Sequence, residues 1–225
     1  MAISPSTRGT GFWAATGASV FAIAYIVGQI FEWAGMLGST GGPNAASSPL
    51  GIAVLLTPSL LLGPSFVVLM AALHAAAPEN RKVFTLAGLA FAVMYATLTG
   101  MVYFVQLTFV APRLAVGDTA GIELLLFVPY RSFLFAVDLL GYSLMSMATL
   151  IAAFALPAAP YARAARIAMI ANGALLPCLA FQMFVPVLIW RAAMWAITFP
   201  AATLLLAAMF RKARCSAPEG ESEGG

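Results

Sequence analysis

Charged residues are scarce in this sequence of 225 residues: Asp, Glu, Lys and Arg together make up 8% of it. A typical soluble domain has about 25% charged residues. Hydrophobic residues make up 62% of the chain, and the mean hydropathy is +0.96. A soluble protein of this size could not bury that much apolar surface behind a charged exterior. The composition therefore excludes a soluble enzyme, a disordered protein and a nucleic-acid-binding domain, and it predicts an integral membrane protein.

Residues that commonly hold metals or cofactors are also scarce. The sequence has one histidine, His74, and two cysteines, Cys178 in an apolar run and Cys215 near the polar C-terminal segment. One histidine cannot supply a bis-histidine haem site or a histidine-based zinc site. The sequence contains no phosphate-binding glycine loop, zinc-protease motif, Gly-x-Ser-x-Gly motif or dinucleotide fingerprint. We therefore predict no metal site and no cofactor, and no motif names a reaction.

Long apolar runs are the main feature that the sequence does contain. A membrane-spanning helix needs about 20 apolar residues, whereas the strands of a membrane barrel are about ten residues long and alternate in polarity. The runs here are continuous, and they predict helices over residues 12–36, 50–76, 83–111, 132–155, 164–189 and 190–211. The predicted fold class is all-α: a polytopic membrane protein built as a bundle of six transmembrane helices. Residues 121–131 (GIELLLFVPYR) predict a short interfacial or re-entrant helix before the fourth span.

Lysine and arginine are distributed unevenly between the two sides of the predicted bundle. One side carries Arg8, Arg81, Lys82, Arg163, Arg166, Arg211, Lys212 and Arg214, and the other carries Arg113, Arg131 and Arg191. The positive-inside rule then predicts that both termini are cytoplasmic, in the inner (plasma) membrane of a bacterium. The first run is longer than the apolar part of a signal peptide, so we interpret it as the first span. The predicted organisation is a cytoplasmic segment over 1–11, a single transmembrane domain over 12–211 and a disordered cytoplasmic tail over 212–225.

Polar and aromatic side chains recur at helical spacing inside these runs, which places them on one face of each predicted helix. Tyr25, Gln29 and Glu32 are spaced by four and three residues, and Asp138 and Tyr142 by four. Further runs contribute Tyr103 with Gln106, Gln182, and Arg191 with Trp195. At a rise of about 1.5 Å per residue, counted from the cytoplasmic ends, polar groups of five helices fall in the outer third of the membrane: Glu32, Tyr103, Gln106, Asp138, Gln182 and Arg191. We therefore predict an outward-facing polar and aromatic pocket at this level.

Asp138 is the most informative of these residues, because it lies between apolar neighbours inside a span. An aspartate facing lipid costs roughly 2.5–3.5 kcal/mol, so its side chain should face the interior. Asp138 and Glu32 are the candidate catalytic residues. The candidate ligand-binding residues are Tyr25, Gln29, Tyr103, Gln106, Tyr142, Gln182, Arg191 and Trp195. The alternatives are a structural ion pair of Asp138 with Arg131 or Arg191, and an ordinary interfacial position for Glu32 and Arg191.

Two of the runs each contain a pair of prolines. Pro58 and Pro64 lie in the second run, and Pro177 and Pro186 lie in the fifth. Proline removes a backbone hydrogen bond and tends to kink a helix. These runs are the second spans of two three-span halves, and interrupted spans at matching positions are typical of transporter sites. Kinks that only shape the bundle are the alternative.

The run Phe135–Leu150 (FAVDLLGYSLMSMATL) places an acidic residue ahead of a Gly-Tyr pair inside a span. In this run and in its general plan, the chain resembles a family of small bacterial integral membrane proteins with six spans. That resemblance implies the fold and carries no activity. In size and helix number the chain is also similar to membrane-bound terpene cyclases, which are small helical bundles that use carboxylates and no metal. This second similarity is one of architecture and assigns no residue.

Three functions fit the predicted pocket, and the sequence leaves them open. In the first, a small hydrophobic molecule binds from the outer leaflet to a metal-free, acid-catalysed enzyme of the isomerase or cyclase type, with Asp138 or Glu32 as the proton donor. The second is a small-molecule or proton-coupled transporter, and the third is a structural or accessory membrane subunit. The expected partners are membrane lipids and the small hydrophobic molecule, but not nucleic acid. Self-association into a homo-oligomer stays open.

Overall fold

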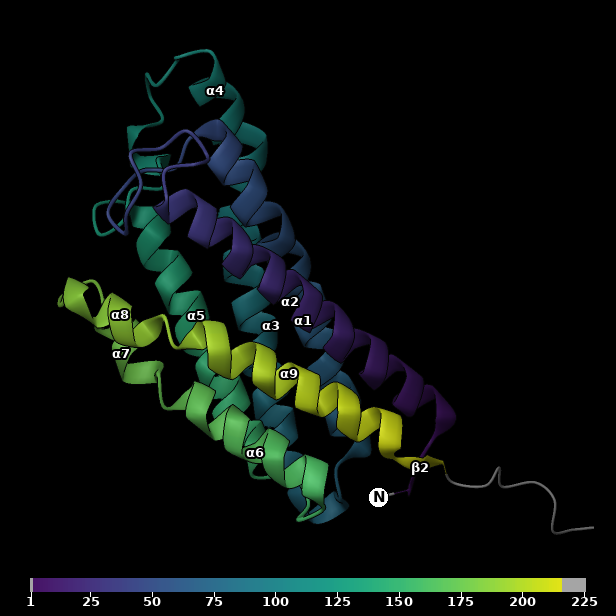
Figure 1. Cartoon of the computed structure of the whole chain (residues 1–225). Coiled ribbons are helices and arrows are strands. Elements are labelled where there is room, and N and C mark those ends of the chain that lie inside the picture. The colour runs from purple at the N-terminus through teal and green to yellow at the C-terminus, as the bar shows by residue number, and fades with distance from the viewer. Residues whose placement is uncertain (1, 216–225) are drawn as a thin grey trace, which may run out of the picture.

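Helices that run antiparallel to their neighbours in the chain form one bundle in the computed structural model, which describes residues 2–215 (Figure 1). The longer helices are α1 (Pro5–Trp33), α2 (Pro49–Ala76), α3 (Lys82–Val105), α5 (Phe133–Ala153), α6 (Pro160–Gly173) and α9 (Trp195–Lys212). The shorter α-helices are α4 (Ala111–Ala115), α7 (Leu176–Ala180) and α8 (Ile189–Ala192). Other helical turns are η1 (Glu79–Arg81), the π-helical η2 (Gln106–Val110), η3 (Glu123–Leu125) and η4 (Pro186–Leu188). The two-residue strands β1 (Ala2–Ile3) and β2 (Arg214–Cys215) pair in parallel.

Serine caps fix the starts of three long helices. Ser4, Ser48 and Ser132 precede α1, α2 and α5, and the hydroxyl of each accepts a hydrogen bond from a backbone N–H in the first turn. Such a bond satisfies one of the backbone donors that a helix start leaves without a partner. Proline follows the cap in α1 and α2, where its fixed φ suits the first helical position. α1 therefore begins at Pro5, inside the segment 1–11 that we expected to precede the first span.

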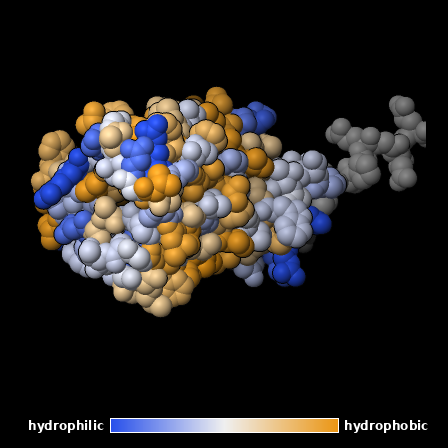
Figure 2. Space-filling model, turned by 90° about the horizontal axis from the view of Figure 1, so that it is seen from above, coloured by the Kyte–Doolittle hydropathy of each residue, from blue (hydrophilic) through white to orange (hydrophobic). Residues whose placement is uncertain are grey.

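Five helical stretches are long and apolar enough to cross a membrane: Pro5–Trp33, Pro49–Ala76, Glu79–Ala115, Phe133–Ala153 and Pro186–Lys212. Large apolar side chains such as Trp13, Ile30 and Leu140 are exposed on their outer faces. Figure 2 shows hydrophobic residues over the middle of the visible face, with hydrophilic residues toward its two ends. These features indicate a multi-pass membrane protein built as a helical bundle.

The predicted fifth span, 164–189, is not one continuous helix. α6 ends at Gly173, α7 is a five-residue helix, and η4 follows a turn. Pro177 has no N–H, and in a continuous helix its ring would clash with the carbonyl of Gly173, four positions earlier. β1 and β2 nevertheless bring the two ends of the described chain to the same end of the bundle (Figure 1). A chain that crosses the membrane an even number of times must have both ends on the same side. The count of six spans stays a prediction.

The two proline pairs differ in effect. α2 continues without a break from Pro49 to Ala76 although Pro58 and Pro64 lie inside it. It packs against α1 on one side and α3 on the other, and these contacts hold the helix across both prolines.

Close packing of α3 against α5 orients the inner face of α5. Gly141 makes the approach possible, since a Cβ atom at this position would lie 2.4 Å from Cγ2 of Thr99. About two thirds of α5 is buried, more than of any of the other four long apolar stretches. Asp138 and Tyr142 lie on its inner face, so this helix carries polar side chains into the bundle.

The segment 121–131 forms less helix than we expected. Only η3 is helical, and an irregular chain leads from Leu126 to α5. Tyr130 has a φ of 62°, which is rare for a residue other than glycine. At the C-terminal end, α9 extends to Lys212, and residues 216–225 of the expected tail lie outside the described residues.

Candidate functional site

A cavity of about 330 Å³ lies inside the end of the bundle opposite the chain termini. Its walls come from α1, α2, α5, α7, α8 and α9, and from the loops that contain residues 42–47 and 127–129. Most of the lining is apolar, with Ile26, Ile52, Leu55, Leu56, Phe135 and Leu139 among the lining residues. The cavity therefore combines an apolar body with the few polar groups described next.

Seven of the predicted site residues line this cavity: Tyr25, Gln29, Glu32, Asp138, Tyr142, Gln182 and Trp195. They come from α1, α5, the turn after α7, and α9, so residues far apart in the sequence meet around one space. Three predicted site residues lie elsewhere. Tyr103 and Gln106 are buried behind the cavity wall, and Arg191 is exposed on α8.

Glu32 is buried at the end of α1, with 3% of its surface exposed. Neither of its carboxyl oxygens has a hydrogen-bond partner within residues 2–215. The carboxyl group lies against the first turn of α2, because a Cβ atom on Gly51 would be 2.5 Å from Glu32 Oε2. Helix N-termini attract negatively charged side chains. Gly51 thus provides the space in which Glu32 turns inward rather than toward the membrane surface.

Asp138 is buried in the second turn of α5, with 8% of its surface exposed. Its Oδ1 atom has no hydrogen-bond partner in the described part of the chain. The two arginines considered as its partners, Arg131 and Arg191, are both exposed. Among residues 2–215 the only ion pair joins Lys82 to Glu79. The structure therefore does not form the structural ion pair that we weighed for Asp138.

Aromatic rings make up the wall next to Asp138. The rings of Tyr25 and Tyr142 each meet Trp195 edge to face, with centroids 6.0 Å and 5.3 Å apart. The Tyr103 hydroxyl donates a hydrogen bond of 3.3 Å to the Tyr142 hydroxyl, so Tyr103 supports this wall from behind. The Tyr25 hydroxyl donates to Gln29 Oε1 at 2.9 Å. These contacts fix the ring orientations and present aromatic surface to the cavity.

The roof of the cavity is the segment 122–131 together with the turn after α7. Gln106 Nε2, in the π-helical turn η2, donates a 2.6 Å hydrogen bond to the Leu125 carbonyl. Gln182 Nε2 donates to the Tyr130 hydroxyl at 3.3 Å, while Gln182 Oε1 is buried and has no partner among the described residues. Burial raises the pKa of the Tyr130 hydroxyl, so this group stays neutral. The roof is thus attached at two points.

The rim of the cavity includes apolar residues on the outer surface of the bundle. Ile30 on α1 and Ala193 after α8 both line the cavity and are exposed, Ile30 by 60%. Trp33 and Trp190 reach toward each other from α1 and α8, with ring centroids 5.8 Å apart. Exposed apolar residues of α1 and of the segment after α8 thus border the cavity.

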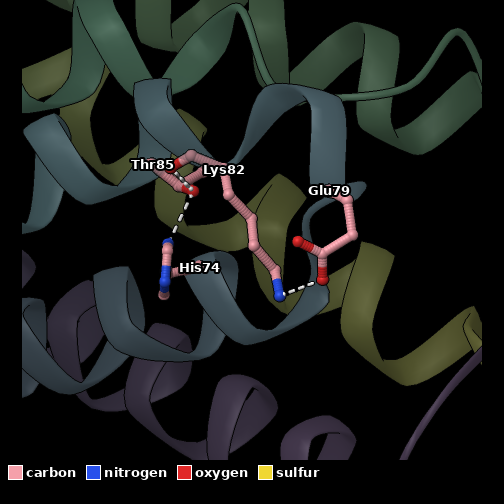
Figure 3. A network of polar contacts seen from close by, with 4 residues as sticks. All are labelled: His74, Glu79, Lys82 and Thr85. Atoms are coloured by element: carbon pink, nitrogen blue, oxygen red, sulfur yellow. Dashed lines mark hydrogen bonds and ion pairs between the residues drawn. The ribbon is translucent and has the colours of Figure 1, made fainter.

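A separate polar cluster lies at the opposite end of the bundle (Figure 3). His74 Nδ1 is 3.0 Å from the Thr85 hydroxyl, and the Lys82 ammonium pairs with the Glu79 carboxylate. The first contact joins the end of α2 to the start of α3, and the second joins η1 to the first residue of α3. No group of three or more His, Cys, Asp or Glu side chains suited to a metal ion occurs in residues 2–215.

Sequence patterns missed several residues that shape the site. Gly51 and Trp33 act through contacts between helices, which helical spacing within one segment does not reveal. The sequence does contain a signal for Gly51, because a glycine in the first turn of a helix, close after a serine cap, leaves space for a side chain from another helix.

Comparisons with protein-family models, curated proteins and solved structures find no match for this chain. The geometry of the cavity is thus the basis for assigning a function.

Proposed function

We propose that the protein binds a small, largely hydrophobic molecule in this cavity, with the polar end of the molecule facing Glu32 and Asp138. One observation carries the proposal: a cavity of about 330 Å³ is lined by two buried carboxyl groups, and both oxygens of Glu32 and Oδ1 of Asp138 lack hydrogen-bond partners among the described residues. A buried acceptor without a partner costs about 1–3 kcal/mol. A ligand that supplies the missing hydrogen bonds would recover that cost. Mostly apolar pockets with a few converging polar groups are typical of small-molecule sites.

We place the cavity toward the outside of the cell and both termini in the cytoplasm, in the inner (plasma) membrane of a bacterium. The basic residues support this orientation. Most of them, including Arg8, Lys82 and Arg211, belong to the end of the bundle where the termini lie. Cytoplasmic loops of membrane proteins are enriched in lysine and arginine. The ligand then reaches the cavity from the outer leaflet.

Acid catalysis is the first activity that this site can support. A protonated Asp138 would donate its proton to an olefin, epoxide or carbonyl group of the bound molecule. The rings of Tyr25, Tyr142 and Trp195 would stabilise the positive charge that develops next to them. The supporting observation is that these rings line the same cavity as Asp138.

Transport is the second activity, and the broken last hairpin favours it. Residues 174–194 contain only short helical pieces, and several of these residues line the cavity. Interrupted helices beside a substrate site are typical of membrane transporters. Movement of this hairpin relative to α1 would open the cavity.

Photo-crosslinking tests the binding site. The protein, in phosphatidylcholine nanodiscs, is irradiated with a diazirine derivative of phenylbutanol, and the labelled peptides are identified by mass spectrometry. We expect saturable labelling of α1, α5 and α9 at cavity residues. Leu139→Trp, which fills the cavity, should reduce this labelling by about tenfold. Leu140→Trp is the matched control, because Leu140 is exposed on the outer face of the same helix.

Labelling that does not saturate, or that spreads over outward-facing residues such as Val68 and Met101, would contradict the proposal. Asp138→Asn then separates the activities. An acid-catalysed enzyme keeps binding the neutral phenylbutanol probe and loses turnover, whereas a proton-coupled carrier keeps binding this probe and loses pH-driven uptake. A variant that binds normally and only assembles poorly would indicate a structural subunit.

A further inference from the structure

The buried cavity-lining atoms that lack a hydrogen-bond partner share one property. All of them are oxygen atoms: Glu32 Oε1 and Oε2, Asp138 Oδ1 and Gln182 Oε1. Within residues 2–215, no buried side-chain nitrogen on the lining lacks a hydrogen-bond partner. Ionised carboxylates and amide carbonyl oxygens only accept hydrogen bonds. The side chains carrying them are at least nine-tenths buried. A ligand that satisfies this cavity must therefore bring hydrogen-bond donors.

No basic side chain in the described part of the chain pairs with these acceptors. No lysine, arginine or histidine lines the cavity in the described part of the chain. Arg131 and Arg191, the nearest in sequence to the walls, are exposed. Two carboxyl groups in an apolar space without a cation are costly in their charged form. A cationic ligand would offset that cost directly.

The walls suit a cation that carries a hydrocarbon body. The faces and edges of Tyr25, Tyr142 and Trp195 lie beside Asp138, and aromatic faces attract ammonium groups. The apolar lining and the apolar rim at Ile30 and Ala193 would be left unused by a small hydrated metal ion. Both features favour an organic cation.

We propose that the ligand of this cavity is a lipophilic amine in its protonated form, with N–H groups directed at Glu32, Asp138 and Gln182 and an aromatic or aliphatic body against the walls. This inference rests on the proposed function and narrows its ligand class. It fits the carrier activity more closely than acid catalysis, because a carboxylate can release a proton as it takes up a cation and release the cation as it is protonated again.

The test compares three molecules that each carry a phenyl ring on a four-carbon chain. Phenylbutylamine is positively charged, phenylbutanol is neutral and phenylbutyrate is negatively charged. Each competes with the diazirine phenylbutanol for saturable labelling in nanodiscs of phosphatidylcholine, a zwitterionic lipid that does not concentrate cations. We expect half-maximal competition by the amine at a concentration about tenfold lower than by the alcohol, with the carboxylate weakest.

Variants locate the preference. Asp138→Asn and Glu32→Gln keep the side-chain shape and remove the charge, so each should raise the half-maximal concentration of the amine about tenfold and that of the alcohol by less than about threefold. Asp118→Asn removes an exposed carboxylate at the same end of the bundle, outside the cavity lining, and should change neither. The ranking of the three molecules on the unmodified protein needs no variant, so it tests the inference even if a variant folds poorly.

Three results would overturn the inference. The first is equal competition by amine and alcohol while saturable labelling persists, which leaves the proposed function intact. The second is an amine preference that survives in both carboxyl variants. The third is competition by sodium ions alone, which would indicate a site for inorganic cations. Absence of saturable labelling would instead overturn both the inference and the proposed function.

Discussion

Gly51 and Glu32 are in close contact beside the cavity. The carboxyl group of Glu32 occupies the space that a side chain at position 51 would fill, at the positive end of the α2 dipole. The inward orientation of Glu32 therefore depends on a glycine in another helix.

Gly51→Ala should displace the Glu32 carboxyl group and weaken phenylbutylamine binding by about fivefold to tenfold, because one acceptor no longer faces the ligand. Competition labelling measures the change. Gly100→Ala is the control: no atom lies within 4 Å of an added Cβ there, and alanine is the better helix former. Unchanged binding in Gly51→Ala would show that Glu32 does not need this space. An equal loss of binding in Gly100→Ala would show that the effect is not specific to position 51.

Sequence reasoning at this scale succeeded where the argument concerned one residue and its solvation. The cost of exposing an aspartate to lipid predicted that Asp138 faces inward, and it is buried. The predicted partners of Asp138, Arg131 and Arg191, do not pair with it. Arg131 lies just before the Ser132 cap, where its side chain is exposed. Which residues of different helices face each other depends on helix rotation and offset, and spacing within one segment does not contain that information.

At the scale of elements, the roof segment 122–131 depends on a hydrogen bond from outside it. Gln106 lies in the π-helical turn that follows α3, and this turn aims its amide at the Leu125 carbonyl. π-helical turns often occur at functional sites. Tyr130, with its positive φ, marks the other attachment, to Gln182.

Gln106→Leu should remove the first attachment without changing side-chain volume much. We expect backbone amides of residues 122–130 to exchange hydrogen faster, by about tenfold, because the roof opens more often. Hydrogen–deuterium exchange with mass spectrometry measures this. Thr108→Val is the control, since the Thr108 hydroxyl donates only to the Phe104 carbonyl in its own helix. Unchanged exchange in Gln106→Leu would mean that packing alone holds the roof.

Element boundaries could be predicted from the sequence to the extent that local signals set them. The apolar runs 50–76 and 132–155 agree within two residues with α2 and α5, where serine caps mark the starts. The run 164–189 was predicted as one helix and is broken between Gly173 and Ile189. Hydropathy measures how apolar a segment is, and it does not show whether neighbouring helices hold a proline-containing segment together.

At the scale of the whole molecule, the two ends of the bundle differ. The paired strands β1 and β2 (Figure 1) and most of the basic residues lie at one of them. The residues that line the cavity come from the other end of the bundle. The turn between α1 and α2 and the turn between α5 and α6 should therefore face opposite sides of the membrane.

Single-cysteine labelling checks this arrangement. In a background with Cys178→Ser and Cys215→Ser, we expect Thr40→Cys to react with a membrane-impermeant maleimide in intact cells, and Ala158→Cys to react only after permeabilisation. Both positions are exposed, so the comparison reports the side of the membrane rather than burial. Reaction of both variants from outside would contradict the count of crossings between them, and the reverse pattern would contradict the orientation.

The apolar rim between α1 and α8 has a consequence for any measurement of affinity. A molecule that reaches the cavity past Ile30 and Ala193 passes directly from hydrocarbon into protein. The concentration that sets occupancy is then its mole fraction in the lipid phase. An apparent dissociation constant expressed per litre of buffer should rise in proportion to the amount of lipid added, while the constant expressed per mole of lipid stays fixed.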